Sequence, residues 1–258
     1  MKNLLVFSGL PSSGKTSVAF SLAKKIELEL NKKVMVIGSD QIRAMIPILD
    51  VRFVPEREEM IRNFTLILVE KALDYNDVVI NDDMNYYKSM RHDFYKIARV
   101  KECNFFIVYF KLDLDIVLEW NKKRGLPIPQ DLIKKIAKKF DKFGTYSWDS
   151  PIFTVDNYNN TPDKNADLIL EQLRDKLDTP HDCLTDISGK NLPKLSDFYD
   201  KYTRKIVSEL LKNPENRRFK KEILKIRKEV LAHVLKNNLN LPILIVLLDA
   251  RLHRFFED

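Results

Sequence analysis

A phosphate-binding loop near the N-terminus constrains the fold of this chain more than any other feature. The apolar run 4–7 precedes the loop, and a helical pattern follows it. The loop consists of small and polar residues and ends in a lysine and a threonine: Gly9, Leu10, Pro11, Ser12, Ser13, Gly14, Lys15 and Thr16. This strand–loop–helix order is typical of a P-loop. An ordinary glycine–serine turn before a helix is the alternative, but such a turn does not need the specified glycines, lysine and threonine of the P-loop pattern. The sequence therefore predicts that the chain binds a nucleoside triphosphate.

The chemistry of the loop indicates what its residues do. Small residues let successive N–H groups turn inward around the β-phosphate, and the N-terminus of the next helix favours an anion. We expect Lys15 to reach the β- and γ-phosphates and the Thr16 hydroxyl to ligate Mg²⁺. Residues 9–17, with Ser17 as the last, are the predicted nucleotide-binding residues, and ATP and Mg²⁺ are the predicted cofactors.

A second strand end carries an acidic residue suited to phosphoryl transfer. Ligands of open α/β sheets bind at the carboxyl ends of the strands, and Asp40 and Arg43 follow the apolar run 34–37. Asp40 is a predicted catalytic residue, because a carboxylate there accepts a proton from a substrate hydroxyl and helps to hold the metal. Arg43 is expected to contact a phosphate. The alternative is that Asp40 only caps the short helix after it.

A third strand end, after the apolar run 78–80, carries Asp82 and Asp83. This arrangement suits a direct or water-mediated Mg²⁺ contact opposite Thr16, so Asp82 is a predicted metal ligand. An Asp-rich turn without a ligand is the alternative. The switch elements of a GTPase are not recognisable, which favours transfer of the γ-phosphoryl group to a substrate hydroxyl.

A basic segment at about residues 124–147 is predicted to act as a lid. Arg124 begins this segment and is the residue that we expect to touch a phosphate. A Lys-rich amphipathic stretch follows at 134–140. A lid excludes water, so that transfer outcompetes hydrolysis. For the lysines, an ordinary solvated helix face is the alternative.

Alternation of apolar runs with helical periodicity predicts an α/β fold with a parallel sheet and crossover helices. We expect strands near 3–8, 33–38, 77–81, 104–110 and 152–155. We expect helices near 15–31, 56–75, 87–100, 113–123 and 164–177. Residues 1–178 are predicted to form a P-loop kinase domain and 179–193 a linker. Residues 194–258 are predicted to form a small all-α domain, with helices near 195–213, 216–236 and 241–256.

The chain is basic, with a formal net charge of +7, and part of this charge gathers in the predicted tail domain. Positions 217–228 combine an apolar stripe with a basic outer face, which predicts an amphipathic helix that contacts a polyanion. The cations assigned to this face are Arg217, Arg218, Lys220, Lys221, Lys225, Arg227 and Lys228.

The composition of the chain indicates in which cellular compartment we expect the protein. No apolar run approaches the roughly 20 residues of a membrane span, so we expect no membrane association. The apolar segment 241–248 is interpreted as either the core of the tail domain or the contact of a homodimer. Cys103 and Cys183 lie in dissimilar surroundings, so we expect no disulfide and a cytoplasmic location.

Along its length the sequence resembles the archaeal O-phosphoseryl-tRNA(Sec) kinase family. The matching segments are 9–16, 39–43, 82–87, 89–91, 139–141, 148–151 and 203–209. The resemblance implies ATP-dependent phosphorylation of serine esterified to selenocysteine tRNA, with a helical domain that grips the D-arm. It implies that Asp40 lies near the seryl hydroxyl and that Asp82 is a carboxylate on the metal side. The predicted tRNA-binding residues are Arg204, Lys205, Arg217, Arg218, Lys221 and Lys225, and seryl-tRNA(Sec) is the predicted partner.

The chain departs from this family in the lid. Relatives often carry two arginines four positions apart before the lid turn, and here the pair is Trp120 and Arg124. Lys122 and Lys123 add charge but lack the bidentate fork of arginine. Three other functions remain open: a P-loop tRNA-modification factor with RNA-stimulated ATPase activity, a kinase of another small hydroxyl substrate, and a nucleotide-gated RNA-binding protein.

Overall fold

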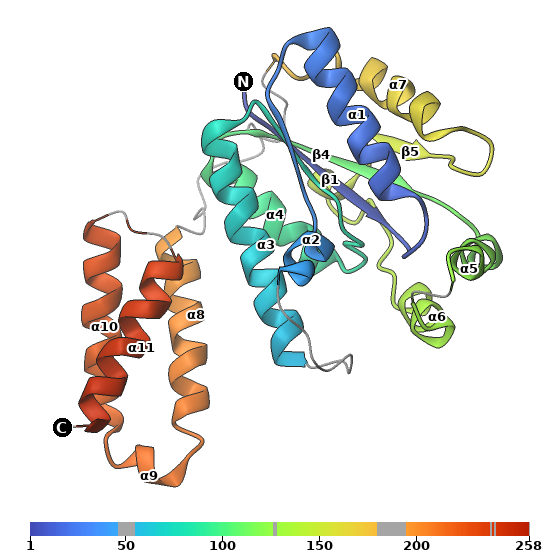
Figure 1. The fold of residues 1–258 in the computed structure, drawn as a ribbon. Coiled ribbons are helices and arrows are strands. Elements are labelled where there is room, and N and C mark those ends of the chain that lie inside the picture. The colour runs from blue at the N-terminus through green and yellow to red at the C-terminus, as the bar shows by residue number, and fades with distance from the viewer. Residues whose placement is uncertain (46–54, 126–127, 180–194, 238, 240, 258) are drawn as a thin grey trace. The chain divides into compact units, whose positions relative to one another are not determined.

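The chain folds into two compact units, Met1–Lys190 and Asn191–Asp258 (Figure 1). The computed structural model describes residues 1–45, 55–125, 128–179, 195–237, 239 and 241–257. Residues 180–193 of the predicted linker, and with them Cys183, lie outside the described residues.

A five-stranded parallel sheet forms the centre of the first unit, with the strand order β2-β3-β1-β4-β5. Its strands are β1 (Asn3–Gly9), β2 (Val34–Ile37), β3 (Val78–Asn81), β4 (Asn104–Phe110) and β5 (Phe153–Val155). In register, Leu5 of β1 lies between Ile80 of β3 and Phe106 of β4. Every residue of β1 is buried, because a parallel sheet is covered on both faces. The predicted α/β fold with a parallel sheet is thus confirmed.

Two hydrophobic clusters fill the space between the sheet and its helices. On one face lie α1 (Lys15–Leu30) and α7 (Pro162–Leu173), whose Leu22 and Ile169 join Leu5 and Phe7 of β1 in one cluster. On the other lie α3 (Pro55–Tyr75) and α4 (Lys88–Val100), where the cluster includes Leu4, Val6, Val69, Leu73 and Phe94. Alternate residues of β1 therefore face opposite helical layers, as the two-residue period of a strand requires.

Four short elements follow the carboxyl ends of the strands. These are α2 (Ser39–Ala44) after β2, and α5 (Leu114–Lys123), α6 (Gln130–Lys138) and the short 3₁₀ helix η1 (Ser147–Asp149) between β4 and β5. Parallel strands all end at the same edge of the sheet, so these elements and the loop after β1 gather there. This edge holds the residues singled out from the sequence of the first unit.

The second unit is helical and consists of α8 (Leu195–Leu210), α9 (Pro214–Arg217), α10 (Lys220–Lys236) and α11 (Leu241–Glu257). Its buried apolar residues are Tyr199, Val207, Ile223, Val230, Val234, Leu244, Leu248 and Leu252. The prediction of one helix over 216–236 was wrong at its start. Asn213 caps the separate turn α9 by accepting the Glu215 N–H at 3.0 Å, and α10 begins only at Lys220.

The apolar segment 241–248 contributes to the interior of the second unit, since Leu244 and Leu248 are fully buried there. Phe255 and Phe256 of α11 meet the ring of Phe219 edge-on, with centroid distances of 5.5 and 6.2 Å. These rings fasten the last helix to the start of α10. Among the helices that the structure describes, none combines the length and apolar character needed to cross a membrane.

Candidate functional site

The loop between β1 and α1 has a backbone shaped to surround an anion. Gly14, the N-cap of α1, has φ 84°, and Ser12 has φ 59°. No side chain caps α1, so N–H groups of its first turn point toward the loop. A Cβ on Gly14 would lie 2.5 Å from Nδ2 of Asn157 and would also face the Trp120 ring at 3.8 Å. Both the backbone angle and the lack of space therefore require glycine at this position.

Two asparagines that the sequence analysis missed brace this loop from different elements. Asn157, just after β5, donates from Nδ2 to the Ser13 carbonyl at 2.6 Å and accepts from the fully buried Asn165 at 2.6 Å. Asn121 of α5 is also fully buried and lies 3.3 Å from the Ser12 hydroxyl. Isolated asparagines carry no motif spacing, so the sequence offers no signal for them.

The ammonium group of Lys15 lies inside its own loop. Its Nζ donates to the carbonyls of Gly9 at 3.0 Å and Leu10 at 2.6 Å, and it lies 3.3 Å from the Ser13 hydroxyl. Burial lowers the pKa of Lys15 to about 8, against the opposing effect of nearby carboxylates, of which Asp82 is the strongest. To contact a phosphate, the ammonium must exchange carbonyl oxygens for phosphate oxygens.

Thr16 and Asp82 lie together, as the sequence analysis expected. The Thr16 hydroxyl lies near enough to the Asp82 carboxyl to affect its pKa, and Asp82 is only 9% exposed. Burial raises the pKa of Asp82, while the Thr16 hydroxyl and the charge of Lys15 oppose that rise. The Asp82 main chain continues the sheet, because its N–H donates to the Ile37 carbonyl at 2.9 Å. Asp83 instead accepts the Met84 N–H at 2.8 Å and stabilises the turn.

Asp40 lies in the first turn of α2 but does not cap it, because the N-cap is Gly38. Its carboxylate is 93% exposed and pairs with Arg43 at 2.5 Å. Glu58 of α3, a residue that the sequence analysis missed, holds the same guanidinium at 2.7 Å. Burial lowers the pKa of Arg43, but the hydrogen bond and charge of Glu58 outweigh it and the pKa is raised. Arg43 is therefore clamped between two carboxylates, and any phosphate contact must compete with them.

Arg124 ends α5 and is exposed. Its charge makes a small contribution to lowering the pKa of Lys15, and its contact with a phosphate stays a prediction. In α6, by contrast, Ile133 and Ile136 are buried while Lys134 and Lys135 are exposed. That pattern is the solvated helix face that was the alternative for the lysines of this stretch.

The segment after β3 is held rigidly against the sheet. Asn85 has φ 42°, and its Nδ2 donates to the Phe7 carbonyl at 2.8 Å and to Oδ1 of Asn81 at 2.7 Å. The fully buried Arg91 donates to the carbonyls of Asn85 at 3.1 Å and Tyr86 at 3.3 Å. The loop that carries Asp82 therefore leads into a fixed turn, which the sequence analysis noted only as a matching segment.

The predicted tRNA-binding cations all lie on the surface of the second unit. Exposed side chains are found for Arg204, Lys205, Arg217, Arg218, Lys221 and Lys225. The assignment of Arg227 to the basic outer face was wrong: it is 4% exposed and pairs with Asp200 at 2.7 Å. Helical spacing places position 227 on the buried stripe of Ile223 and Val230, a signal that the charge of the residue concealed.

Asp40, Arg43 and Asp82 thus gather at the carboxyl edge of the sheet, beside the loop, and their roles in phosphoryl transfer stay predictions. Within the described residues, no group of three His, Cys, Asp or Glu side chains is arranged to hold a metal by itself. The Thr16 hydroxyl and the Asp82 carboxylate lie near one another beside the phosphate loop, and their role as metal ligands stays a prediction. A parallel five-stranded sheet with a phosphate loop after its central strand defines a P-loop kinase-like fold, a nucleotide-binding class.

Comparison with known proteins supplies the family. The family model for chromatin associated protein KTI12 matches residues 2–251, almost the whole chain. The L-seryl-tRNA(Sec) kinase of Methanococcus maripaludis is 34% identical over 248 residues, which cover 91% of this chain and 89% of that protein. The chain therefore belongs to the KTI12 family of P-loop kinases, together with this archaeal relative.

Other members match over a smaller part. The KTI12 homolog of Danio rerio is 26% identical over 162 residues, which cover 62% of this chain and only 58% of that protein. The crystal structure of Chaetomium thermophilum Kti12 in complex with ADP-AlF3 superposes with a TM-score of 0.56 at 19% identity. It covers 68% of this chain and 100% of that chain, and this likeness concerns the fold.

Proposed function

We propose that the protein transfers the γ-phosphate of ATP to the seryl hydroxyl of Ser-tRNA(Sec), giving O-phosphoseryl-tRNA(Sec). One observation carries this proposal. Similarity to the Methanococcus maripaludis L-seryl-tRNA(Sec) kinase extends over 91% of the chain, whereas the similarity to the zebrafish KTI12 homolog covers 62%. A match of this extent includes residues of the helical second unit, the part proposed to bind tRNA.

The proposed nucleotide site is the loop of residues 9–17. ATP binding draws the Lys15 ammonium from the carbonyls of Gly9 and Leu10 onto phosphate oxygens, while the N–H groups of the loop surround the β-phosphate. Arg124 contacts the phosphates from the end of α5. The brace from Asn157 to Ser13 holds the loop in this shape, so that little reorganisation accompanies binding.

Mg²⁺ fits the oxygen donors beside the loop. Thr16 and Asp82 present a hydroxyl and a carboxylate that lie near one another, and Mg²⁺ is commonly held by one or two such ligands together with phosphate oxygens. Bound there, the ion neutralises charge on the transferring phosphoryl group. In this proposal Asp82 holds the metal, and its burial beside Lys15 keeps both groups in a poorly solvated setting.

The proposed acceptor side is formed by α2. Asp40, exposed at the carboxyl end of β2, orients the seryl hydroxyl and accepts its proton during in-line attack on the γ-phosphorus. Arg43 keeps the Asp40 carboxylate in place and is itself held by Glu58. Positioning and charge stabilisation supply most of the acceleration in such a reaction.

A second candidate is a P-loop tRNA-modification factor with RNA-stimulated ATPase activity. The observation that favours it is the match of the KTI12 family model over residues 2–251. Both candidates require a nucleotide on the P-loop and RNA on the second unit. They differ in the fate of the γ-phosphate, which goes to a hydroxyl in the first and to water in the second.

Transfer of label from γ-labelled ATP separates the candidates. Seryl-tRNA(Sec), seryl-tRNA(Ser), uncharged tRNA(Sec) and free serine are compared in one assay. Label on seryl-tRNA(Sec) alone, released when base hydrolyses the ester, supports the kinase and its RNA discrimination. Labelled free serine would point to a small-molecule kinase, and RNA-stimulated release of inorganic phosphate without a labelled acceptor would favour the modification factor.

A further inference from the structure

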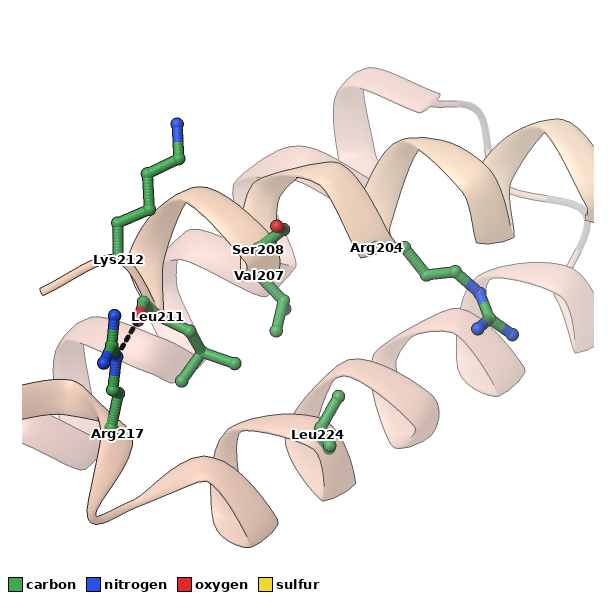
Figure 2. Close-up of a pocket in the computed structure, with 7 residues that line it drawn as sticks. All are labelled: Arg204, Val207, Ser208, Leu211, Lys212, Arg217 and Leu224. Carbon is green, nitrogen blue, oxygen red and sulfur yellow. Dashed lines mark hydrogen bonds between the residues drawn. The ribbon is translucent and has the colours of Figure 1, made fainter. Parts of the chain in front are cut away.

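A pocket in the second unit has an apolar centre and cationic ends (Figure 2). Its volume is about 410 Å³, and α8, α9 and α10 supply its lining: Arg204, Val207, Ser208, Leu211, Lys212, Arg217 and Leu224. The volume lies in the range of about 300–1,000 Å³ that is usual for small-molecule sites. The pocket is therefore large enough to hold a small molecule or part of a larger ligand.

Arg204, Val207 and Ser208 of α8 form one continuous face with Leu211 and Lys212, which directly follow this helix. The Leu211 N–H still donates to the Val207 carbonyl at 3.0 Å, so the three- and four-residue spacing that places side chains on one side extends past the end of α8. Figure 2 shows Val207 and Leu211 directed toward Leu224 of α10, with Arg204 at one end of this row and Lys212 at the other. Val207 is 2% exposed and forms the floor. At about 1.5 Å per residue, the two end positions lie roughly 12 Å apart along the helix.

The charge of the pocket is positive. Arg217 donates from Nε to the Leu211 carbonyl at 3.1 Å, which holds its guanidinium at the end near Lys212. Lys212 pairs with Glu209 at 2.7 Å, but both side chains are more than half exposed, so this pair is weak and gives way to a phosphate. At the other end Asp200 is shared between Arg204 at 2.6 Å and Arg227 at 2.7 Å. Three cations, Arg204, Lys212 and Arg217, thus line the pocket, and two of them pair with the carboxylates of Asp200 and Glu209.

We propose that this pocket receives an unpaired nucleotide of a bound RNA, with the base against Val207, Leu211 and Leu224 and the flanking phosphates on the cations at its two ends. An unpaired nucleotide presents a flat, weakly polar face and a phosphate on either side, which is the pattern that the pocket complements. RNA recognition commonly uses such exposed bases in loops and bulges. The planar guanidinium of Arg217 can stack on the face of the base or donate hydrogen bonds to its edge.

The inference deepens the proposed function, because it names what the second unit recognises in its RNA. It assigns to this unit a preference for unpaired nucleotides, in addition to attraction by charge. A surface of cations alone would bind a fully paired duplex as well as a hairpin with the same number of phosphates.

The test compares two RNA probes on the full-length protein by fluorescence anisotropy: a hairpin with a short unpaired loop and a blunt duplex with equal phosphate count. The wild type should bind the hairpin at least about 5-fold more tightly. Leu224→Trp fills the pocket and should abolish this preference while leaving duplex affinity unchanged, whereas the matched control Leu224→Met should keep it. Thermal melting confirms that each variant is folded.

A second variant keeps the proposal falsifiable if Leu224→Trp is unstable. Lys212→Gln should weaken hairpin binding several-fold, and Lys236→Gln, which removes an exposed cation elsewhere on α10, should not. Equal affinity of the wild type for hairpin and duplex, or a hairpin preference that survives both pocket variants, would overturn the inference. Binding of an acidic amphipathic peptide that Leu224→Trp abolishes, with no discrimination between the RNAs, would overturn it in favour of a protein partner. Neither RNA carries serine, so these outcomes do not depend on the kinase activity.

Discussion

The guanidinium of Arg91 and the carboxylate of Asp149 form a bidentate ion pair in which both side chains are fully buried. The two hydrogen bonds run from Nε to Oδ1 at 2.6 Å and from Nη2 to Oδ2 at 2.9 Å. The Phe143 ring lies 4.3 Å from the same guanidinium. This pair joins α4, which follows the Asp82 loop, to the end of η1, just beyond the predicted lid.

Breaking this pair should destabilise the first unit strongly. Arg91→Leu leaves the Asp149 carboxylate buried without its partner, and such a loss costs about 3–5 kcal/mol. The double variant Arg91→Leu with Asp149→Leu should recover part of that loss, because no uncompensated charge remains. Urea unfolding followed by tryptophan fluorescence measures this, since Trp120 and Trp148 both lie in the first unit. Equal stability of the Arg91→Leu variant and the wild type would contradict the argument.

Asp40→Asn should lower kcat by at least about 10²-fold and leave ATP affinity within a few-fold of the wild type. The amide cannot accept the seryl proton, whereas Lys15 and the phosphate loop are unchanged. Asp115→Asn on α5 is the matched control, because it removes another exposed carboxylate of the same unit. Turnover close to that of the control would move the proton-accepting role to Asp82 or Asp83.

Nucleotide affinity should fall as the pH rises above 8. Lys15 has a pKa of about 8 in the protein without nucleotide, and phosphate oxygens favour its charged form, so binding raises that pKa. At a pH between the Lys15 pKa of the free protein and the higher Lys15 pKa of the complex, the protein takes up a proton when nucleotide binds. In this pH range the nucleotide affinity decreases by up to about tenfold per pH unit.

Calorimetric titration with ADP at pH 7.5 and 9, in buffers that differ in ionisation enthalpy, measures this uptake. Proton uptake should be small at the lower pH and approach one at the higher. Lys15→Met should abolish the difference. Affinity that does not change over this interval would show that Lys15 remains charged throughout, against its burial.

Replacing Arg218, Lys221 and Lys225 together by glutamine should reduce the slope of log affinity for tRNA against log salt concentration by roughly two units. Each cation that neutralises a phosphate releases counterions, and single-stranded and duplex regions differ only modestly in this respect. The matched control replaces three exposed cations of the first unit: Lys24, Lys164 and Arg174. An unchanged slope for the first variant would remove this face of α10 from the RNA interface.

The sequence was sufficient to predict the sheet and the phosphate loop because both depend on local patterns. Apolar runs of strand length that alternate with helical patterns favour a parallel sheet, and the spacing of Gly14, Lys15 and Thr16 after the first run favours a phosphate loop. The position of Asp82 beside Thr16 also followed, since parallel strands end at one edge. Residue roles in catalysis and RNA binding stay predictions.

Long-range polar contacts could not be predicted in the same way. Asn157 reaches Ser13 across 144 positions and Arg91 reaches Asp149 across 58, and no periodicity relates such residues. The charge of Arg227 predicted an exposed position, because a buried arginine is rare unless it is paired. Its partner, Asp200, lies on another helix, where only the folded unit brings it near.

Gly38 lies so close to the Asp82 main chain that a Cβ there would meet the Asp82 carbonyl oxygen at 2.4 Å. Its own φ of −134° is one that any residue adopts, so only the lack of space requires glycine. The Gly38 main chain consequently lies directly against the Asp82 main chain, and the Gln41 side chain fills the remaining space, with its Oε1 2.6 Å from the same Cβ position. Evolution therefore cannot adjust the distance between the Asp40 and Asp82 carboxylates by substituting a larger residue for Gly38. A relative with a different acceptor would have to change the helix beyond Gly38 and keep this junction.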